Sequence, residues 1–511
     1  MFGRILKLAF ALCAGFSACT PLSPGDQVVR DAAMDLDSGQ HDAGHESEHP
    51  EPTPEAGPPT DAGSDAGSST MGCKPPGQRG NTVKRMLEIT EDTRWTCETD
   101  YELVGAAVVR AGTLTIDPGV RIKVRNGSGL VISKEARLVA AGTAQEPIVF
   151  TAVEHPAQPG AWRGVFLLGK APTSLPETSS LGLSAADISS HFGGSDVNHD
   201  CGQLEHVRIE FAGGLADEYA FPSSALTLAG CGRKTSVHDV QIHAATDGLG
   251  LIGGQAPIKR VLVTAATADG IEWTAGYSGL LQFVVVQSFY GAGAALKGSQ
   301  DEGKPDSTPP SSPIIFNATL VGANAKGLPR GVGDPNGLET GILLQAGTRA
   351  TIRNSVVYGF AGSWVDIIDV VTAQHVGTDL TIRNTIFGGP EPRMHPGFPG
   401  TGAEPGDGTM DDDGSFSEDQ TFREPSLQNR FPPIILQRPF DPPPLRPDFS
   451  ADSYVNSSNL EGNVPTGWEG VFESAAYAGA LPKIEFEADR ALDWTQAEQS
   501  GEPVWTDFPQ E

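Results

Sequence analysis

Apolar and polar residues alternate along many short stretches of this chain from about Tyr101 onward. Gly, Asn and Asp separate these stretches, and almost nothing has the spacing of an amphipathic helix. A period of two is the pattern of a β-strand with one face buried. We therefore predict an all-β fold of many short strands; in its first part the alternating positions are Val108, Leu114, Ile116, Val120, Ile122 and Val124.

The predicted strands recur at a spacing that can be counted. The run VQIHAA at 240–245 resembles VLVTAA at 261–266 after a shift of 21 residues, and VVVQS at 284–288 follows after another 23. Polar, Pro-rich inserts such as 298–312 and 323–340 lengthen the later intervals. Repeats of this length, made of strands and turns, are typical of a β-solenoid whose coils stack on one another.

We therefore predict a right-handed parallel β-helix over residues 101–389. Two other all-β folds agree less well with this pattern. A β-sandwich lacks such a constant register, and a propeller blade needs a repeat nearly twice as long. Exposed strand edges at the two ends of a solenoid need covering. Residues 73–100, with Met86, Leu87 and Ile89, are expected to form an N-terminal cap.

The chain after the solenoid divides into two segments. Residues 390–450 carry thirteen prolines and an acidic run at 411–413, which central strands do not tolerate. We expect them to form an excursion that packs loosely on the solenoid. Residues 451–511 are expected to cover the bottom of the core with their large aromatic side chains, Trp468, Tyr477, Trp494 and Trp505.

The first residues have the features of an export signal. Arg4 and Lys7 precede a short apolar run at 8–16, which is too short to span a membrane. The sequence FSAC at 16–19 resembles a lipobox, so we predict a signal peptide over 1–18 and lipidation of Cys19. Pro21, two places after Cys19, favours sorting to the outer membrane. An ordinary signal peptide cut near Ala18 is the alternative.

Residues 19–72 are expected to be a disordered tether behind the lipidated cysteine. Between 20 and 72 there are eleven acidic residues and one basic residue, among Ala, Gly, Pro and Ser. Such a composition buries too little apolar surface to offset its chain entropy. His41, His45 and His49 have a spacing that a helix would turn into a metal site, but their neighbours are poor helix formers. We predict no metal site there.

The net charge argues against one class of partner, and the cysteine content suggests disulfides. The formal net charge of −29 argues against nucleic acid, which needs clustered Lys and Arg. After export and lipidation, four cysteines remain, an even number that suggests disulfides in an oxidising compartment. Closeness in sequence favours the pairs Cys73–Cys97 and Cys201–Cys231 among the three possible pairings.

Several motifs resemble a broad group of secreted bacterial lipoproteins with pectin-lyase-like β-helices, mostly of unassigned function. The matching stretches are GTLTIDPGV at 112–120, AGT at 141–143 with PIVFT at 147–151, GAWRGV at 160–165, CGQL at 201–204 with VRIEFAGG at 207–214, AAYAGA at 475–480, and WTDF at 505–508. The resemblance implies export and the β-helix. It implies no activity, because a fold alone does not carry one.

One group of residues has the pattern of a catalytic site. Many pectin-lyase-like β-helices cleave acidic polysaccharides with carboxylate pairs, or with Ca²⁺ and a basic residue. Asp247 and Asp269 are 22 residues apart, so they should stack in adjacent coils roughly 5 Å apart, near the separation in retaining glycosidases. Glu272 and His243 could join them. We favour a different interpretation, in which each Asp–Gly pair shapes a turn, with Gly at positive φ and Asp bonding its own backbone.

Other candidate residues have simpler explanations. Trp162 and Trp273 could stack on sugar rings but are more typical of turn packing, and His206 and Glu210 lie beside a predicted disulfide. No Arg/Lys dyad for lyase chemistry is evident. We predict no cofactor; Ca²⁺ is the one ion that the family resemblance leaves open.

These observations favour a lipid-anchored envelope protein at the outer membrane, displayed on its tether. Its β-helix is expected to bind an extracellular polysaccharide or a surface protein without catalysis. The alternative is a polysaccharide-degrading enzyme, a lyase or a glycoside hydrolase, on the same fold.

Overall fold

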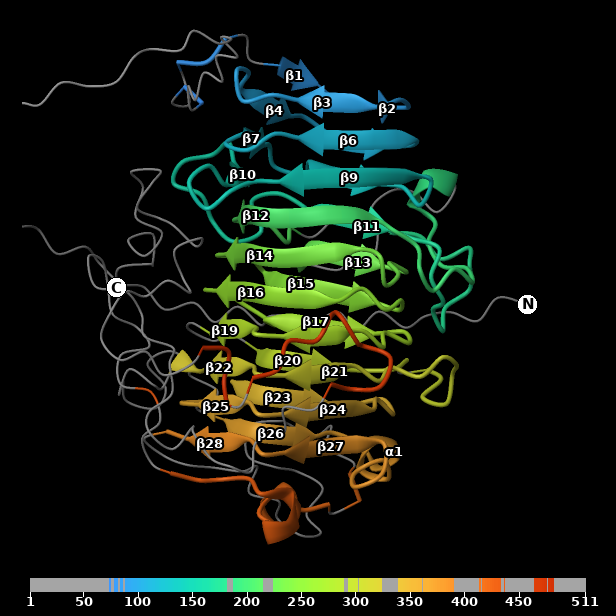
Figure 1. Cartoon of the computed structure of the whole chain (residues 1–511), viewed down its shortest axis with the longest axis vertical. Helices are drawn as coiled ribbons and strands as arrows, with labels where there is room; N and C mark the ends of the chain where they lie inside the picture. The colour runs from blue at the N-terminus through green and yellow to red at the C-terminus, as the bar shows by residue number, and fades with distance from the viewer. Residues whose placement is uncertain are drawn as a thin grey trace, which may run out of the picture. The chain divides into compact units, whose positions relative to one another are not determined.

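Short parallel strands wind around one core in successive coils, each coil contributing strands to three faces (Figure 1). The computed structural model describes residues 73–481 apart from 75–77, 81–82, 86–87, 182–186, 215–223, 289–292, 302, 324–338, 361, 390–412, 415, 433–435, 437–463 and 476. The predicted signal, Cys19 and the tether lie outside these residues. No helix in the described part is long and apolar enough to cross a membrane.

The first and second faces share three long strands that bend from one face to the other, β12 (Gly202–Glu210), β14 (Ser236–His243) and β16 (Ile258–Thr264). The first face also holds β3 (Thr93–Trp95), β6 (Gly112–Ile116), β9 (Ala136–Ala141), β18 (Leu280–Gln282), β21 (Ile314–Phe316), β24 (Ala350–Arg353) and β27 (Leu380–Arg383). The second holds β1 (Val83–Arg85), β4 (Tyr101–Leu103), β7 (Arg121–Val124), β10 (Ile148–Ala152), β19 (Val285–Gln287), β22 (Thr319–Val321), β25 (Val356–Tyr358) and β28 (Ile386–Gly388).

The third face is a separate sheet of ten parallel strands. Its members are β2 (Glu88–Ile89), β5 (Ala106–Val109), β8 (Gly129–Ile132), β11 (Val165–Leu168), β13 (Ser224–Ala229), β15 (Asp247–Ile252), β17 (Ile271–Thr274), β20 (Ala294–Gly298), β23 (Thr340–Leu344) and β26 (Ser363–Ile367).

The predicted register is confirmed. Val240 pairs with Val261, a shift of 21 residues, and Leu262 pairs with Val285, a shift of 23. Because paired strands stay aligned from coil to coil, even across longer insertions, inward side chains stack in columns that exclude water. One first-face column has every member at 1% exposed or less: Ile116, Ala140, Leu204, Val237, Ile258, Leu281, Ile315, Ile352 and Ile382. This stacking is the main source of stability in a solenoid.

Both predicted disulfides are present. Cys73 is bonded to Cys97 with a Cα–Cα distance of 5.6 Å, and Cys201 to Cys231 with 5.7 Å. The first pair ties the beginning of the described chain to the turn after β3. The second joins the residue before β12 to the turn after β13.

The ends of the solenoid differ from what the sequence predicts. Strands β1 to β3 already pair with β4 to β6, so part of the expected cap is the first coil itself. At the bottom, the core is covered by part of the expected Pro-rich excursion, which includes α2 (Glu418–Phe422) and η3 (Pro425–Leu427). Phe422 is 1% exposed there, and the ring of Phe431 stacks 5.6 Å from that of Phe387.

The described part of the aromatic C-terminal segment lies along the side of the solenoid instead of under it (Figure 1, red). Trp468 and Phe472 pack against Leu280 and Phe316. The backbone of Glu473 exchanges two hydrogen bonds with the Gln282 side chain, at 2.6 and 3.0 Å. Trp494 and Trp505 lie outside the described residues.

Candidate functional site

Three acidic residues and one lysine meet on the outer side of the third face. Asp247 begins β15, Asp269 stands two residues before β17, Glu272 lies within β17 and Lys297 within β20. Since Glu272 pairs with Gly250 on one side and with Lys297 on the other, these side chains lie on consecutive coils. The structure thus brings together the three carboxylates that the repeat register selects.

Hydrogen bonds to the next coil hold two of the carboxylates. Asp247 Oδ1 accepts the backbone N–H of Asp269 at 2.8 Å, and Asp269 Oδ1 accepts that of Ala294 at 2.8 Å. Asp269 Oδ2 forms an ion pair with Lys297 Nζ at 2.8 Å. Carboxylate oxygens of Asp247, Asp269 and Glu272 all lie within 4.8 Å of one another. The cluster is therefore fixed to the sheet and not to a loop.

Burial and neighbouring charges shift the pKa values of Glu272 and Lys297 in this cluster. Burial, followed by the charges of Asp247 and Asp269, raises the pKa of Glu272 to about 8, and Lys297 opposes this effect. Burial lowers the pKa of Lys297, but the charge and hydrogen bond of Asp269 outweigh it, so that this pKa is raised. Near neutral pH, Glu272 thus holds a proton while Lys297 is charged.

The predicted turn role of the Asp–Gly pairs needs correction. Neither Gly248 nor Gly270 is among the residues with positive φ. Instead, a Cβ on Gly248 would lie 2.3 Å from Gly270 O, and one on Gly270 would lie 2.6 Å from Ala295 O. Glycine is required there by close packing, and the aspartates bond the following coil instead of their own turn.

Lys297 is a member of the site that sequence reasoning missed. It lies 25 residues after Glu272, one coil further, so the repeat register could have found it. Carboxylate oxygens are ligands that hard cations such as Ca²⁺ accept. Because Lys297 already supplies a positive charge beside Asp269, we assign no metal ion to the cluster.

The other candidate residues lie apart from this cluster. His243 is on the second face, where its Nδ1 lies 2.9 Å from Thr264 Oγ1 and burial lowers its pKa to about 3. Trp162 and Trp273 are 0% and 1% exposed. Their indole N–H groups donate to Glu210 O at 2.7 Å and Thr348 Oγ1 at 3.0 Å. These residues are structural, and Glu210 also pairs with Arg208.

An insertion between β11 and β12 covers part of the outer side of the third face. Its Leu181 and Phe192 pack on the outward apolar residues Val108, Val131, Phe166, Leu168, Ala229, Ile252 and Ala275. Ser174 N donates to Ala275 O at 2.9 Å, just beyond the end of β17. The insertion therefore contacts the third face just beyond the end of the strand that carries Glu272.

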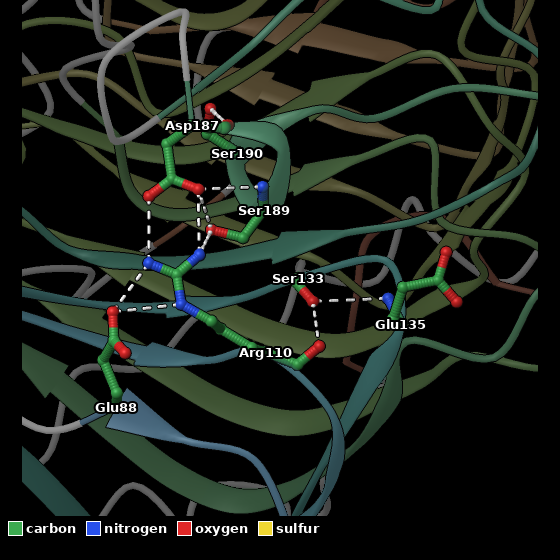
Figure 2. Close-up of polar contacts among 7 residues, drawn as sticks. All are labelled: Glu88, Arg110, Ser133, Glu135, Asp187, Ser189 and Ser190. Carbon is green, nitrogen blue, oxygen red and sulfur yellow. Dashed lines mark hydrogen bonds and ion pairs between the residues drawn. The ribbon is translucent and has the colours of Figure 1, made fainter.

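A network around Arg110 fastens the same insertion to the first coils (Figure 2). Arg110 donates to both carboxylate oxygens of Asp187, at 2.9 and 3.1 Å, to Ser189 Oγ at 2.6 Å and to Glu88 Oε1 at 2.7 Å. Asp187 also caps the short helix η1 (Ile188–Ser190). Arg110 holds the pKa of Asp187 well below its usual range. The network therefore joins the insertion to Glu88 in β2 and to Arg110 just after β5.

A family model described as a pectate-lyase-like beta-helix domain matches residues 87–394, more than half of the chain. No curated protein and no solved structure matches.

Proposed function

This chain belongs to the pectate-lyase-like β-helix domain family, and we propose that it is an envelope protein that binds extracellular glycan without cleaving it. One observation carries the proposal. Asp247 and Asp269 are each committed to a backbone N–H of the next coil, whereas Glu272 and Lys297 remain partly exposed beside them. Such an arrangement offers fixed polar groups to a ligand and leaves the two aspartates little freedom for proton transfer.

The sequence supports an anchored location for this function. Lipidation at Cys19 would attach the chain to the outer membrane, and residues 20–72 would extend the β-helix toward the outside of the cell. Two disulfides suit an oxidising compartment. A surface protein is the other class of ligand that the third face would accept.

A second candidate function is polysaccharide cleavage, and one specific observation favours it. Glu272 has a pKa of about 8 and stands beside two carboxylates, as a general acid beside an ionised partner does. The separations in the cluster, within 4.8 Å, are close to those of retaining glycosidases.

The test is a panel of polysaccharides measured for binding and for turnover. Binding would be followed by calorimetry, and turnover by release of reducing sugar and of unsaturated product. We expect binding of at least one glycan without turnover, weakened by Glu272→Gln. If the wild type shows turnover and a folded Glu272→Gln variant does not, the protein is a polysaccharide-cleaving enzyme. Membrane fractionation of Cys19→Ser tests the anchor, because loss of the lipid should release the chain.

A further inference from the structure

The candidate site contains more negative than positive charge. Three carboxylates face one ammonium group, that of Lys297, among the residues that the structure describes. The raised pKa of Glu272 is consistent with this excess of negative charge, since the proton on Glu272 neutralises part of it. A ligand that brings a positive charge would be favoured at Glu272, whereas an anionic sugar would be repelled. The whole chain, at −29, adds to that repulsion.

Two buried hydroxyl groups lie one coil before the carboxylates, on β13. Ser224 and Thr227 are both 0% exposed, and neither Ser224 Oγ nor Thr227 Oγ1 has a hydrogen-bond partner in the described structure. Buried polar atoms normally have partners, so two neighbouring exceptions need an explanation.

These hydroxyls point toward the carboxylate cluster. Ser224 is the register partner of Asp247, and Gly250 is the register partner of Glu272. Ser224 Oγ lies 2.5 Å from the place where a Cβ on Gly250 would be, and Thr227 Oγ1 lies 3.6 Å from it. Because Gly250 has no side chain, nothing on that residue separates the hydroxyls from Glu272. The site therefore combines acceptor oxygens from three successive coils.

We infer that the glycan bound here carries free amino groups, and that Glu272 and Asp247, backed by the Ser224 and Thr227 hydroxyls, accept hydrogen bonds from its ammonium. An ammonium group has three N–H donors and no acceptor, which complements a set of oxygen acceptors with excess negative charge. The inference rests on the proposed glycan binding and names the chemical class of the ligand. Lys297, already paired with Asp269, would compete with the sugar amine.

The experiment compares two oligomers with the same backbone, glucosamine and N-acetylglucosamine, titrated calorimetrically into the full chain at a pH where the amines are protonated. We expect the glucosamine oligomer to bind at least about tenfold more tightly, the range of a hydrogen bond to a charged group. The bound ammonium should displace the proton from Glu272, so Glu272→Gln, which cannot form a carboxylate, should remove most of that preference. Glu135→Gln is the matched control, since Glu135 is an exposed acid paired with Lys170 on another coil.

A second variant predicts a change in the opposite direction. Lys297→Gln removes the competing ammonium, so affinity for the glucosamine oligomer should rise severalfold. This result would stand even if Glu272→Gln did not fold.

Other outcomes would overturn the inference. Equal affinity for the two oligomers would mean that the amine is not recognised, although glycan binding would survive. Equal losses in Glu272→Gln and Glu135→Gln would mean nonspecific attraction to an acidic protein. Binding of an oligogalacturonate only with added Ca²⁺ would assign the cluster to a metal ion. Failure of every glycan to bind would instead reject the proposed function itself.

Discussion

Two columns of polar residues run along this β-helix, and they are polar for different reasons. Asn317, Asn354 and Asn384 stack at the corner between the first and second faces, with φ of 55°, 51° and 53°. Asp247 and Asp269 stack at the start of third-face strands and are not among the residues with positive φ. The asparagines occupy a backbone geometry that few residue types accept, whereas the aspartates lack that geometry and each accept a backbone N–H of the next coil.

The corner itself shows that its geometry is imposed by the coil. The same position in earlier coils is also left-handed, at His206, Asp239, Arg260 and Phe283, although Arg and Phe are poorly suited to that conformation. Asn is the best of these because its short side chain tolerates positive φ. The asparagine column therefore serves folding. The aspartate column instead concentrates negative charge. Lys297 and the proton on Glu272 offset only part of this charge, and the remaining negative charge favours a cationic ligand.

The largest effect is expected at the corner. Asn354→Val places a β-branched residue at a φ of 51° in a fully buried position, which should destabilise the chain by about 3 kcal/mol. Asn354→Gly accepts that φ and should cost only about 1 kcal/mol. Guanidinium midpoints of the two variants measure the difference. Equal losses would show that the Asn side chain, and not the backbone geometry, governs the corner.

A smaller loss is expected for Asp269→Ala. This change leaves the backbone N–H of Ala294 without its acceptor, whereas Lys297 is partly exposed and can turn toward water. We expect a loss of about 2 kcal/mol, mostly from the unsatisfied N–H. Asp269→Asn keeps the Oδ1 acceptor and is the control, which should lose less than half as much. If the two variants unfold together, the ion pair outweighs the hydrogen bond.

The stability of the chain should depend on pH through Glu272, which lies beside the aspartate column, whereas the asparagine column has no group that titrates. The folded-state pKa of Glu272, about 8, lies above its usual value of 4.5, so the folded chain holds this proton more tightly than the unfolded chain. The resulting stability is complete below about pH 4.5 and is lost as pH rises through about 8. Glu272→Gln cannot lose a proton.

The measurement compares unfolding of the wild type and Glu272→Gln at several pH values. Glu418, whose pKa burial raises to about 9, contributes equally to both chains and cancels in the difference. The wild type should lose stability relative to the variant as pH rises from about 4.5 to 8. A constant difference over this range would mean that Glu272 is ionised throughout. Because Glu272 is partly exposed, we expect this effect to be smaller than that of Asp269→Ala.

The sequence predicts some parts of this structure better than others. Period-two runs and a repeat near 22 residues predict the core columns and the juxtaposition of Asp247 with Asp269, because a regular register converts sequence distance into space. The disulfides follow from the even number of cysteines and their closeness in sequence. Where the register is interrupted, prediction fails. Arg110 and Asp187 meet across 77 residues, and Asn317 meets the carbonyl of Tyr477 across 160. Such contacts depend on the path of an insertion, which no periodic pattern encodes.

The smallest effect is expected for the double variant Asp247→Asn, Asp269→Asn, which also separates binding from catalysis. Asn keeps an Oδ1 that can accept the N–H groups of Asp269 and Ala294, so both hydrogen bonds to the next coil survive. With the two charges removed, Glu272 loses the second cause of its raised pKa, and Lys297 loses its partner. We expect a change in stability below about 1 kcal/mol, because the ion pair is partly exposed.

If the site only binds, the folded double variant should still bind a neutral glycan, while affinity for an amine-bearing glycan falls because negative charge has been removed. If the site cleaves, the wild type must release sugar ends, and the double variant must lose nearly all of that activity while its melting curve stays close to that of the wild type. Thermal melting, calorimetry and product assays on the same two proteins therefore decide between the two functions. Activity in the wild type that survives in the double variant would place catalysis outside this cluster.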